Sequence, residues 1–403
     1  MKKNFSFVSP TKMMLGAALL ACTFQSCESP EEAVTPLDAT ASAAVQGTPI
    51  AGKYIVVLKK DNNRRMPEQA TYAQRQSQAR SRGQQILRER GIAEQALGHA
   101  YGKVLEGFSA DLSEAEVEKL RRDPRVAYIE QDKVISLGKP GGGGTTQPIQ
   151  EKPYGITRVG SADGTGKTAW VIDSGIDLDH PDLNVDVNRS RTFITSGTDA
   201  NSADDGNGHG SHVAGTIAAK NNTIGVIGVA YNATVVAVKV LNSRGSGSTS
   251  GVIAGIDYVG TNGKPGDVAN MSLGGGVSTT LDNAVVNAAK GGVIFCLAAG
   301  NETDDADNHS PARAEGANIY TISAMNNTDT WASFSNYGTH VDWCAPGVSI
   351  KSTWKAGGYN TISGTSMATP HAAGVMLVTG GKPTISGYVK GDPDGKADPI
   401  IHL

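Results

Sequence analysis

The sequence predicts an α/β protein in which a large domain with a mainly parallel sheet follows a small α+β domain of ferredoxin-like arrangement. From residue 151 to 403, short apolar runs alternate with helical stretches, a pattern typical of parallel strands covered by helices on both faces. Residues 50–137 follow the order strand, helix, strands, helix, strand, which is typical of a small α+β sandwich. A Gly- and Pro-rich stretch at 138–150 separates the two parts and is expected to be an exposed linker.

The small domain is predicted element by element from residue propensity and capping signals. In chain order we expect a strand at 53–58, a helix at 68–90, a strand pair within 96–112, a helix from 114 to about 123 and a strand at 126–129. The second helix has the clearest start signal, because Ser113 and Glu116 form a capping box. Leu112 and Val117 stand at the positions of a hydrophobic staple, which fixes the entry of the chain into that helix.

The large domain is predicted as strands that alternate with helices. Strands are expected at 169–172, 234–240, 268–271 and 293–298, and helices at 213–219, 249–259 and 281–290. In an open parallel sheet the site lies beyond the carboxyl ends of the strands, so the residues that follow these strands are the first candidates. After Met376 the last helix is expected to stop early, and 387–403 is predicted to be a strand with loops.

Composition narrows the classes of function. The chain has 403 residues and a net charge of −3, so it carries no basic excess for binding nucleic acid. Its 50 glycines follow no three-residue period, which excludes a collagen, and four cysteines are too few for a disulfide scaffold. Cys296 and Cys344 lie in apolar, strand-like surroundings, so buried thiols are expected, and whether the two pair stays open.

The N-terminal segment predicts export. Lys2 and Lys3 precede an apolar run at 13–21 that has the length of a signal peptide and is too short to span a bilayer. Cys22 or Cys27 would be the first residue of a lipoprotein, or simple cleavage would remove both. Residues 1–27 are therefore the expected signal and 28–49 a tether, which predicts an extracellular or cell-envelope protein that meets a membrane only through a lipid anchor.

Three polar residues in the large domain stand at strand ends or helix starts. Asp173 follows the strand at 169–172, and His209 lies between two glycines just before the helix at 213–219. Ser366 follows a glycine turn at the start of another helix. Each has an ordinary structural explanation: a turn-capping aspartate, a helix-start histidine and an N-cap serine. Together they give Asp, His and Ser in one chain order, which is a known order for a nucleophilic triad.

The surrounding residues strengthen this interpretation. Residues 173–176 (DSGI), 209–216 (HGSHVAGT) and 364–371 (GTSMATPH) resemble the three active-site signatures of the subtilisin-like serine proteases. Residues 334–338 (FSNYG) and 350–354 (IKSTW) are similar to the proteinase K branch of that family. The resemblance extends over about 154–376 and implies a subtilisin-like three-layer domain. It also implies a serine endopeptidase of broad specificity that acts on polypeptides, with His209 hydrogen-bonded to Ser366 and oriented by Asp173.

The resemblance carries further residues into the expected site. Asn301, through its side-chain amide, and Ser366, through its backbone N–H, are expected to form the oxyanion hole. The expected peptide-binding residues are Gly245, Ser246 and Gly247 on a pairing edge, and Ser272, Leu273, Gly274, Ala299 and Gly300 around the primary pocket. A structural calcium ion is implied at the Asp342 carboxylate, with the carbonyls of Ala317 and Ile319 as further ligands. Asp204 and Asp205, by contrast, are expected to lie in a solvated loop.

The small domain resembles an inhibitor-type prodomain, which implies a zymogen whose own prodomain inhibits the active site. Self-cleavage is then expected within the linker at 138–150, and the protein is expected to be a monomer. A binding protein without turnover and an ester hydrolase are the alternatives. Zinc is disfavoured because His209 and His212 lack the HExxH arrangement, and a phosphate loop at 164–168 is disfavoured because it precedes a strand and Ser161 replaces its first glycine.

Overall fold

The computed structural model describes residues 45–61, 66–137 and 147–403. The predicted signal at 1–27, with Cys22 and Cys27, and nearly all of the predicted tether lie outside the described residues, as does the linker at 138–146. Among the helices of the described ranges, none combines the length and the apolar content that a membrane span needs.

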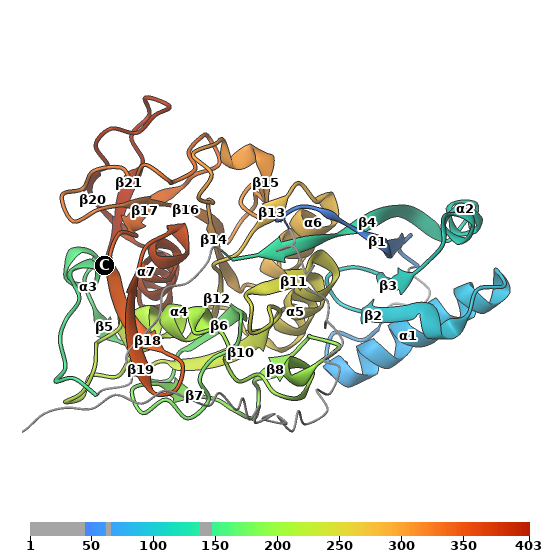
Figure 1. Cartoon of the computed structure of the whole chain (residues 1–403), viewed down its shortest axis with the longest axis horizontal. Helices are drawn as coiled ribbons and strands as arrows, with labels where there is room; N and C mark the ends of the chain where they lie inside the picture. Colours follow the sequence, from blue (N-terminus) through green and yellow to red (C-terminus); the bar gives the residue numbers. More distant parts are fainter. Residues whose placement is uncertain (1–44, 62–65, 138–146) are drawn as a thin grey trace, which may run out of the picture. The chain divides into compact units, whose positions relative to one another are not determined.

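The small domain is an antiparallel sheet with two helices on one face (Figure 1). Its elements are β1 (Pro49–Leu58), α1 (Tyr72–Glu89), η2 (Glu94–Ala96), β2 (Leu97–Tyr101), β3 (Gly107–Asp111), α2 (Glu114–Arg121) and β4 (Val126–Ser136). Leu87 of α1 and Leu120 of α2 pack into one hydrophobic cluster with Phe108 of β3, which places both helices on the same face of the sheet. The predicted order of elements is confirmed.

Two details of this domain follow from the sequence and one does not. The capping box at Ser113 is present, because its side chain accepts from the Glu116 N–H while the Glu116 carboxylate accepts from the Ser113 N–H. Leu112 and Val117 are both buried, as a staple requires. However, β4 continues well past the expected end at residue 129. Its second half pairs with a strand of the large domain, a partner that local sequence does not reveal.

The large domain has a mainly parallel sheet, as predicted. Its strand order is β20-β21-β17-β16-β14-β12-β6-β10-β7, with β8 also paired to β10 and only β20 antiparallel to its neighbour. These strands are β6 (Thr168–Asp173), β7 (Asn184–Val185), β8 (Arg191–Thr192), β10 (Thr234–Lys239), β12 (Val268–Met271), β14 (Ile294–Ala298), β16 (Ile319–Met325), β17 (Trp343–Pro346), β20 (Thr384–Tyr388) and β21 (Pro399–His402). Short pairs join β5 (Ala162–Asp163) to β9 (Ala230–Tyr231), β13 (Gly275–Gly276) to β15 (His309–Ser310), and β18 (Ile350–Trp354) to β19 (Gly358–Ile362).

Helices cover both faces of this sheet and complete three layers. The helices are α3 (Tyr154–Val159), η3 (Thr198–Asn201), α4 (His209–Ala218), α5 (Thr249–Asn262), α6 (Thr279–Ala289), η4 (Ala306–Asn308) and α7 (Thr365–Thr379). Successive residues of β6 face opposite sides: Val171 belongs to the hydrophobic cluster that contains α4 and α7, and Ile172 to the cluster that contains α5 and α6. The apolar run of β6 is continuous because its alternate side chains pack into two hydrophobic cores, one on each face of the sheet.

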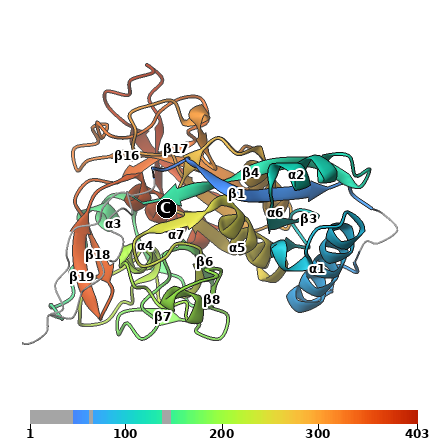
Figure 2. The same ribbon diagram turned by 45° about the vertical axis from the view of Figure 1, so that its right-hand side comes forward.

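The small domain lies against the α5–α6 layer. Ile55 of β1 and Tyr101 of β2 belong to the same hydrophobic cluster as α5 and α6, so the face of the small sheet that its own helices leave open is covered by the large domain. Figure 2 shows β4 passing from the small domain onto the large one, where it pairs with β11 (Ser246–Ser248).

The chain after α7 forms a hairpin. The helix ends at Thr379 because Gly380 adopts a left-handed conformation, with φ 64°, and its N–H bonds back to Met376. The strands β20 and β21 then extend the main sheet beyond β17, where Ile400 and Val389 pack against Met325. The early helix stop is confirmed, and the expected single strand is a two-stranded hairpin.

Candidate active site

Asp173 is fixed by the strand end on which it lies. It is the last residue of β6 and fully buried, and its backbone carbonyl accepts the N–H groups of Val240 and Leu241 beyond β10. Its Oδ1 accepts the N–H of Ser174 at 2.6 Å. Backbone groups therefore hold Asp173 and its carboxylate in one orientation.

His209 begins α4 and faces this carboxylate. Its Nδ1 lies 2.9 Å from Asp173 Oδ1 and 3.0 Å from Oδ2, which places the proton of a neutral imidazole on Nδ1 and leaves Nε2 as the acceptor. Burial acts to lower the pKa of His209, but the negative charge and hydrogen bond of Asp173 and the charge of Asp205 outweigh burial, so the pKa is raised above its usual 6.5.

Asp205 corrects an expectation, because it is buried and not solvated. Its carboxylate accepts the Ser174 hydroxyl at 2.9 Å and the N–H groups of Asn207, Gly208 and Ser211 at 2.8–2.9 Å, together with the Ser211 hydroxyl at 2.7 Å. It therefore joins the turn after Asp173 to the first turn of α4. An acidic residue just before a helix start was the available signal, since an anion is favoured at that end of a helix.

The glycines beside His209 allow close packing of the α4 backbone against its neighbours more than they leave open space around the imidazole ring. The N-cap Gly208 has a φ of 110°, which L side chains rarely adopt, and a side chain there would collide with the Trp354 ring. A side chain at Gly210 would collide with the carbonyl of Gly175. Gly210 lets the first turn of α4 come against the end of β6, which brings His209 to Asp173, and Gly208 lets the same turn come against Trp354 of β18.

Ser366 lies in the first turn of α7, but its hydroxyl is not bonded to His209. Its Oγ donates to the Ser272 carbonyl at 3.1 Å, and the Ser272 hydroxyl donates to the Ser366 carbonyl at 2.8 Å. Within the described residues the predicted bond from Ser366 to His209 is therefore absent. A serine hydroxyl rotates toward an available acceptor, and catalytic hydrogen bonds often form only when substrate is bound.

Asn301 follows β14 and its amide has a fixed direction. Oδ1 accepts the Thr365 N–H at 2.8 Å and the Thr365 hydroxyl at 3.1 Å, so the donor end of the amide points away from Thr365. The loop that carries Asn301 is held by buried Asn336, whose Oδ1 accepts the N–H groups of Glu302 and Asp304. The sequence did not single out Thr365 or Asn336 for these roles.

The predicted pairing edge already carries a strand, and that strand comes from the small domain. The C-terminal half of β4 runs antiparallel to β11, with Ser136 opposite Ser246, Ile135 opposite Gly247 and Val134 opposite Ser248. The register continues one residue further, since the Leu137 N–H donates to the Gly245 carbonyl at 2.8 Å. The edge at 245–248 thus binds an extended segment of the same chain.

The remaining predicted peptide-binding residues lie at the carboxyl ends of the strands of the main sheet. Ser272, Leu273 and Gly274 follow β12, and Ala299 and Gly300 follow β14, so both segments end beside the start of α7. The Leu273 side chain is buried in the hydrophobic cluster that also contains Ile135 of β4. Gly275 was not predicted, yet it lies so close to Ile135 that a side chain there would collide with it. It therefore packs directly against the segment of β4 that pairs with β11.

Carboxylates from both domains hold the small domain in place. Asp257 of α5 is fully buried and accepts the N–H groups of Lys103 and Val104 at 2.7 and 2.9 Å. In the opposite direction, buried Asp132 of β4 accepts the Ser250 N–H at 3.0 Å and the Ser250 hydroxyl at 2.5 Å, at the start of α5. An anion at that end of a helix is favoured by the helix dipole.

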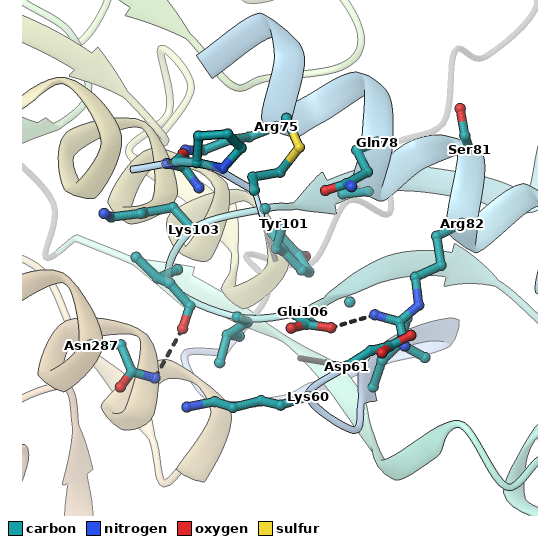
Figure 3. A pocket seen from close by; sticks show the side chains of 18 of the residues that line it. Lys60, Asp61, Arg75, Gln78, Ser81, Arg82, Tyr101, Lys103, Glu106 and Asn287 are labelled. Atoms are coloured by element: carbon teal, nitrogen blue, oxygen red, sulfur yellow. Dashed lines mark hydrogen bonds and ion pairs between the residues drawn. The ribbon is translucent and has the colours of Figure 1, made fainter. Parts of the chain in front are cut away.

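A hollow of about 1100 Å³ lies in the small domain, away from the triad (Figure 3). Residues of α1 and of the β2–β3 connection line it, where Arg82 pairs with Glu106, and Asn287 of α6 donates to the Val104 carbonyl at its rim. Charges of both signs line this hollow, and none of the predicted site residues does. It is therefore not the peptide site.

Oxygen atoms suited to a calcium ion are present at two places. At the predicted one, Asp342 Oδ2 accepts the Thr321 N–H at 2.8 Å, which leaves Oδ1 available, and burial raises the pKa of this carboxyl to about 6. Ala317 and Ile319, whose carbonyls are the other expected ligands, lie just before and at the start of β16, close in sequence to Thr321. Across the described ranges, no three His, Cys, Asp or Glu side chains gather as a metal site.

The second place was not predicted. The amide of Gln150 points Nε2 at the carbonyl oxygens of Lys220 and Val226, at 2.8 and 3.4 Å, and at Asn222 Oδ1, at 3.4 Å. Oxygens that converge in this way also suit a hard cation.

The two cysteines of the large domain are separate, buried thiols. Burial raises the pKa of both Cys296 and Cys344 far above the usual range, so neither is a reactive thiolate.

Comparison with known proteins agrees with the geometry. The profile of the Subtilase family matches residues 164–384, and that of Peptidase inhibitor I9 matches 53–138. The Alkaline serine exoprotease A of Vibrio alginolyticus is 42% identical over 362 residues, which cover 86% of this chain and 64% of that protein. The Alkaline serine protease ver112 of Corniculantispora psalliotae is 39% identical over 344 residues, which cover 81% of this chain and 80% of that protein.

A solved structure supports the same assignment. The crystal structure of a cold adapted subtilisin-like serine proteinase matches with a TM-score of 0.54 and 42% identity, over 62% of this chain and 97% of that one. The chain therefore belongs to the subtilase family. It is a subtilisin-like serine endopeptidase that carries an I9-type inhibitor prodomain, and so it is built as a zymogen.

Proposed function

We propose that this protease hydrolyses peptide bonds through Asp173, His209 and Ser366. The observation that carries the proposal is the Asp173–His209 pair, with Nδ1 and Oδ1 2.9 Å apart, at the sheet edge where α7 presents Ser366. Asp173 holds the imidazole with its proton on Nδ1. Nε2 is then the base that takes the Ser366 proton as Oγ attacks the scissile carbonyl, and it returns that proton to the leaving amine.

The oxyanion of the tetrahedral intermediate would meet two donors. They are the side-chain amide of Asn301 and the backbone N–H of Ser366, which lies in the first turn of a helix and so favours negative charge. Thr365 supports this arrangement, because its two bonds to Asn301 Oδ1 turn the donor end of the amide outward. Donors that are already oriented stabilise the developing negative charge without having to reorganise during the reaction.

The substrate is proposed to be a polypeptide in extended form. The pairing of Val134–Leu137 with 245–248 supports this, because a substrate strand would make the same backbone hydrogen bonds. Backbone pairing does not read side chains, and the glycines on both walls leave room for side chains of several sizes. We therefore propose a broad specificity.

The prodomain is proposed to inhibit the enzyme by occupying this edge. Self-cleavage in the linker at 138–150 would then release the catalytic domain, from which the prodomain must still dissociate. The position of Leu137 on the edge strand supports a cut in the first residues after it, because a bound substrate strand leads toward the nucleophile. The mature enzyme is proposed to act as a monomer.

Calcium and export complete the proposal. A calcium ion bound by Asp342 with the Ala317 and Ile319 carbonyls would supply structural cross-linking and no chemistry. The second set of oxygens, around Gln150, is proposed as a further site. Residues 1–27 are proposed to direct export, with Cys22 or Cys27 as the lipidated residue if the protein is anchored in the cell envelope.

The proposal is tested by expressing the full chain and its Ser366→Ala variant without added protease. The unaltered chain is expected to appear as two fragments cut within 138–150 and to digest casein. The variant is expected to remain one chain and to be inactive. If the variant is cut in the same way, self-cleavage is wrong. If the processed, folded protein binds peptides without cleaving them, it is a binding protein. If it cleaves only esters, it is an ester hydrolase.

A further inference from the structure

A fully buried lysine lies beside the candidate active site. Lys239 is the last residue of β10, in register with Asp173 of β6, and its side chain is 0% exposed. A buried ammonium group is costly unless its charge and its N–H donors find partners. The partners of Lys239 are therefore informative about its role.

The ammonium group connects two segments that are far apart in sequence. Its Nζ donates to the Ser174 carbonyl at 2.5 Å, in the turn that follows Asp173. It also lies 3.1 Å from Asp199 Oδ1. Burial acts to raise the pKa of Asp199, but the hydrogen bonds from Ser243 and from Lys239 outweigh burial and lower it, so the carboxylate stays ionised.

Asp199 continues the connection to the peptide-pairing strand. Its Oδ2 accepts both the N–H and the hydroxyl of Ser243, each at 3.1 Å. Ser243 lies in the tight turn closed by the Asn242 N–H, which donates to the Ser246 carbonyl at 2.9 Å at the start of β11. The carboxylate therefore fixes the turn from which the pairing edge begins.

We infer that Lys239 is a positioning residue that ties the Asp173–Ser174 turn to β11 through Asp199 and Ser243. The inference rests on the proposed catalytic role of Asp173 and the proposed pairing of substrate with β11. Through this link, an extended peptide seated on β11 is held in register with the acid–base pair. A side chain that only filled the core would need neither the Ser174 carbonyl nor Asp199.

The test compares two substrates with the same residue at the cleaved bond. A tetrapeptide p-nitroanilide pairs with β11, whereas a blocked single-residue ester reaches only the primary pocket. In processed Lys239→Met protein, we expect the ratio of kcat/KM for the long substrate to that for the short one to fall about 10- to 100-fold. Lys351→Met is the matched control, because Lys351 pairs with Glu151 at 3.1 Å on the surface of β18, and its ratio is expected to equal that of the unaltered enzyme.

Two further variants separate positioning from stability. Lys239→Met with Asp199→Asn removes both charges, so its Tm is expected to recover while the ratio stays low. Ser243→Ala truncates an exposed side chain at the far end of the link and is expected to lower the ratio by a smaller factor.

Specific results would overturn the inference. An unchanged ratio in Lys239→Met, or in Ser243→Ala if the lysine variant does not fold, shows that Lys239 does not position the edge. A ratio that recovers together with the Tm of the double variant shows a structural role only. If the unaltered enzyme hydrolyses neither substrate, the proposed function fails first and the inference fails with it.

Discussion

The two halves of the active site differ in how completely the protein fixes them. The acid–base half, Asp173 with His209, is buried, and the Asp173 carboxylate is held by the Ser174 N–H and by His209 Nδ1. The half that would touch substrate is more open: Asn301 is exposed and the Ser366 hydroxyl is bonded to Ser272. Under the proposed mechanism, the folded chain already orients the base, whereas the Ser366 hydroxyl must still turn from the Ser272 carbonyl toward His209.

The largest effect is expected from the buried half. His209→Ala removes the base, and because triad members act as a unit, kcat should fall about 10⁶-fold. Hydrolysis of a tetrapeptide p-nitroanilide by protein matured with added protease measures this. A loss below about 100-fold would mean that another group takes the proton. Circular dichroism of the variant serves as the control for folding.

Asp173→Asn keeps the shape of the pair but changes its proton. The amide of the variant donates where the carboxylate accepted, which favours the wrong tautomer of His209, so kcat should fall about 10⁴-fold. The same assay applies, with KM expected to stay nearly constant. A change confined to KM would place Asp173 in substrate binding instead.

The open half should show a smaller loss. Asn301→Ala removes one oxyanion donor and is expected to cost about 3–4 kcal/mol in the barrier, or about 10²–10³-fold in kcat, with little change in KM. Thr365→Val should give part of this loss, because the amide of Asn301 would keep its donor but lose one of its two anchors. Equal kcat in Asn301→Ala and the unaltered enzyme would remove Asn301 from the oxyanion hole.

Asp205→Asn tests whether the buried half depends on its support. Asn can accept with one oxygen only, so donors at the start of α4 lose their partner, which should cost about 2–4 kcal/mol of stability. Urea denaturation of the mature protein measures this. We expect a fall of about tenfold in kcat, and an unchanged midpoint would contradict the role given to Asp205.

The pH profile should show the smallest shift. His209 must be neutral to accept a proton, and its pKa is raised above 6.5 by Asp173 and Asp205, although burial opposes them. Activity should therefore be lost as the pH falls through a midpoint above 6.5, measured as the acid limb of kcat/KM. A midpoint below 6.5 would mean that burial prevails over the two carboxylates.

Local pattern predicted the elements well, because the strands of a doubly covered sheet are continuous apolar runs and the capping box at Ser113 is a local signal. What it did not predict depends on partners distant in sequence. The extension of β4 exists because β11, more than a hundred residues later, pairs with it. Asp205 lies in a polar stretch of the kind found in surface loops. It is buried only because Ser174 and α4, which are distant from each other in sequence, pack around it.

The site residues show the same division. Asp173, His209 and Ser366 were predicted as a triad because the residues around each resemble the three active-site signatures of the subtilisin-like proteases. The direction of the Ser366 hydroxyl could not be predicted, because the hydroxyl rotates and can donate to whichever acceptor lies nearby, here the Ser272 carbonyl. The close approach of Gly275 to Ile135 was not predicted, because it arises only when β4 lies beside this segment.

The most direct measurement of the central claim is covalent labelling of the nucleophile. Processed protein is treated with a fluorophosphonate, digested and mapped by mass spectrometry, with Asp173→Asn as a variant of reduced reactivity. The account predicts a single adduct on Ser366 in the unaltered enzyme and much slower labelling in the variant. Folded, processed protein that carries no adduct on Ser366 would contradict it.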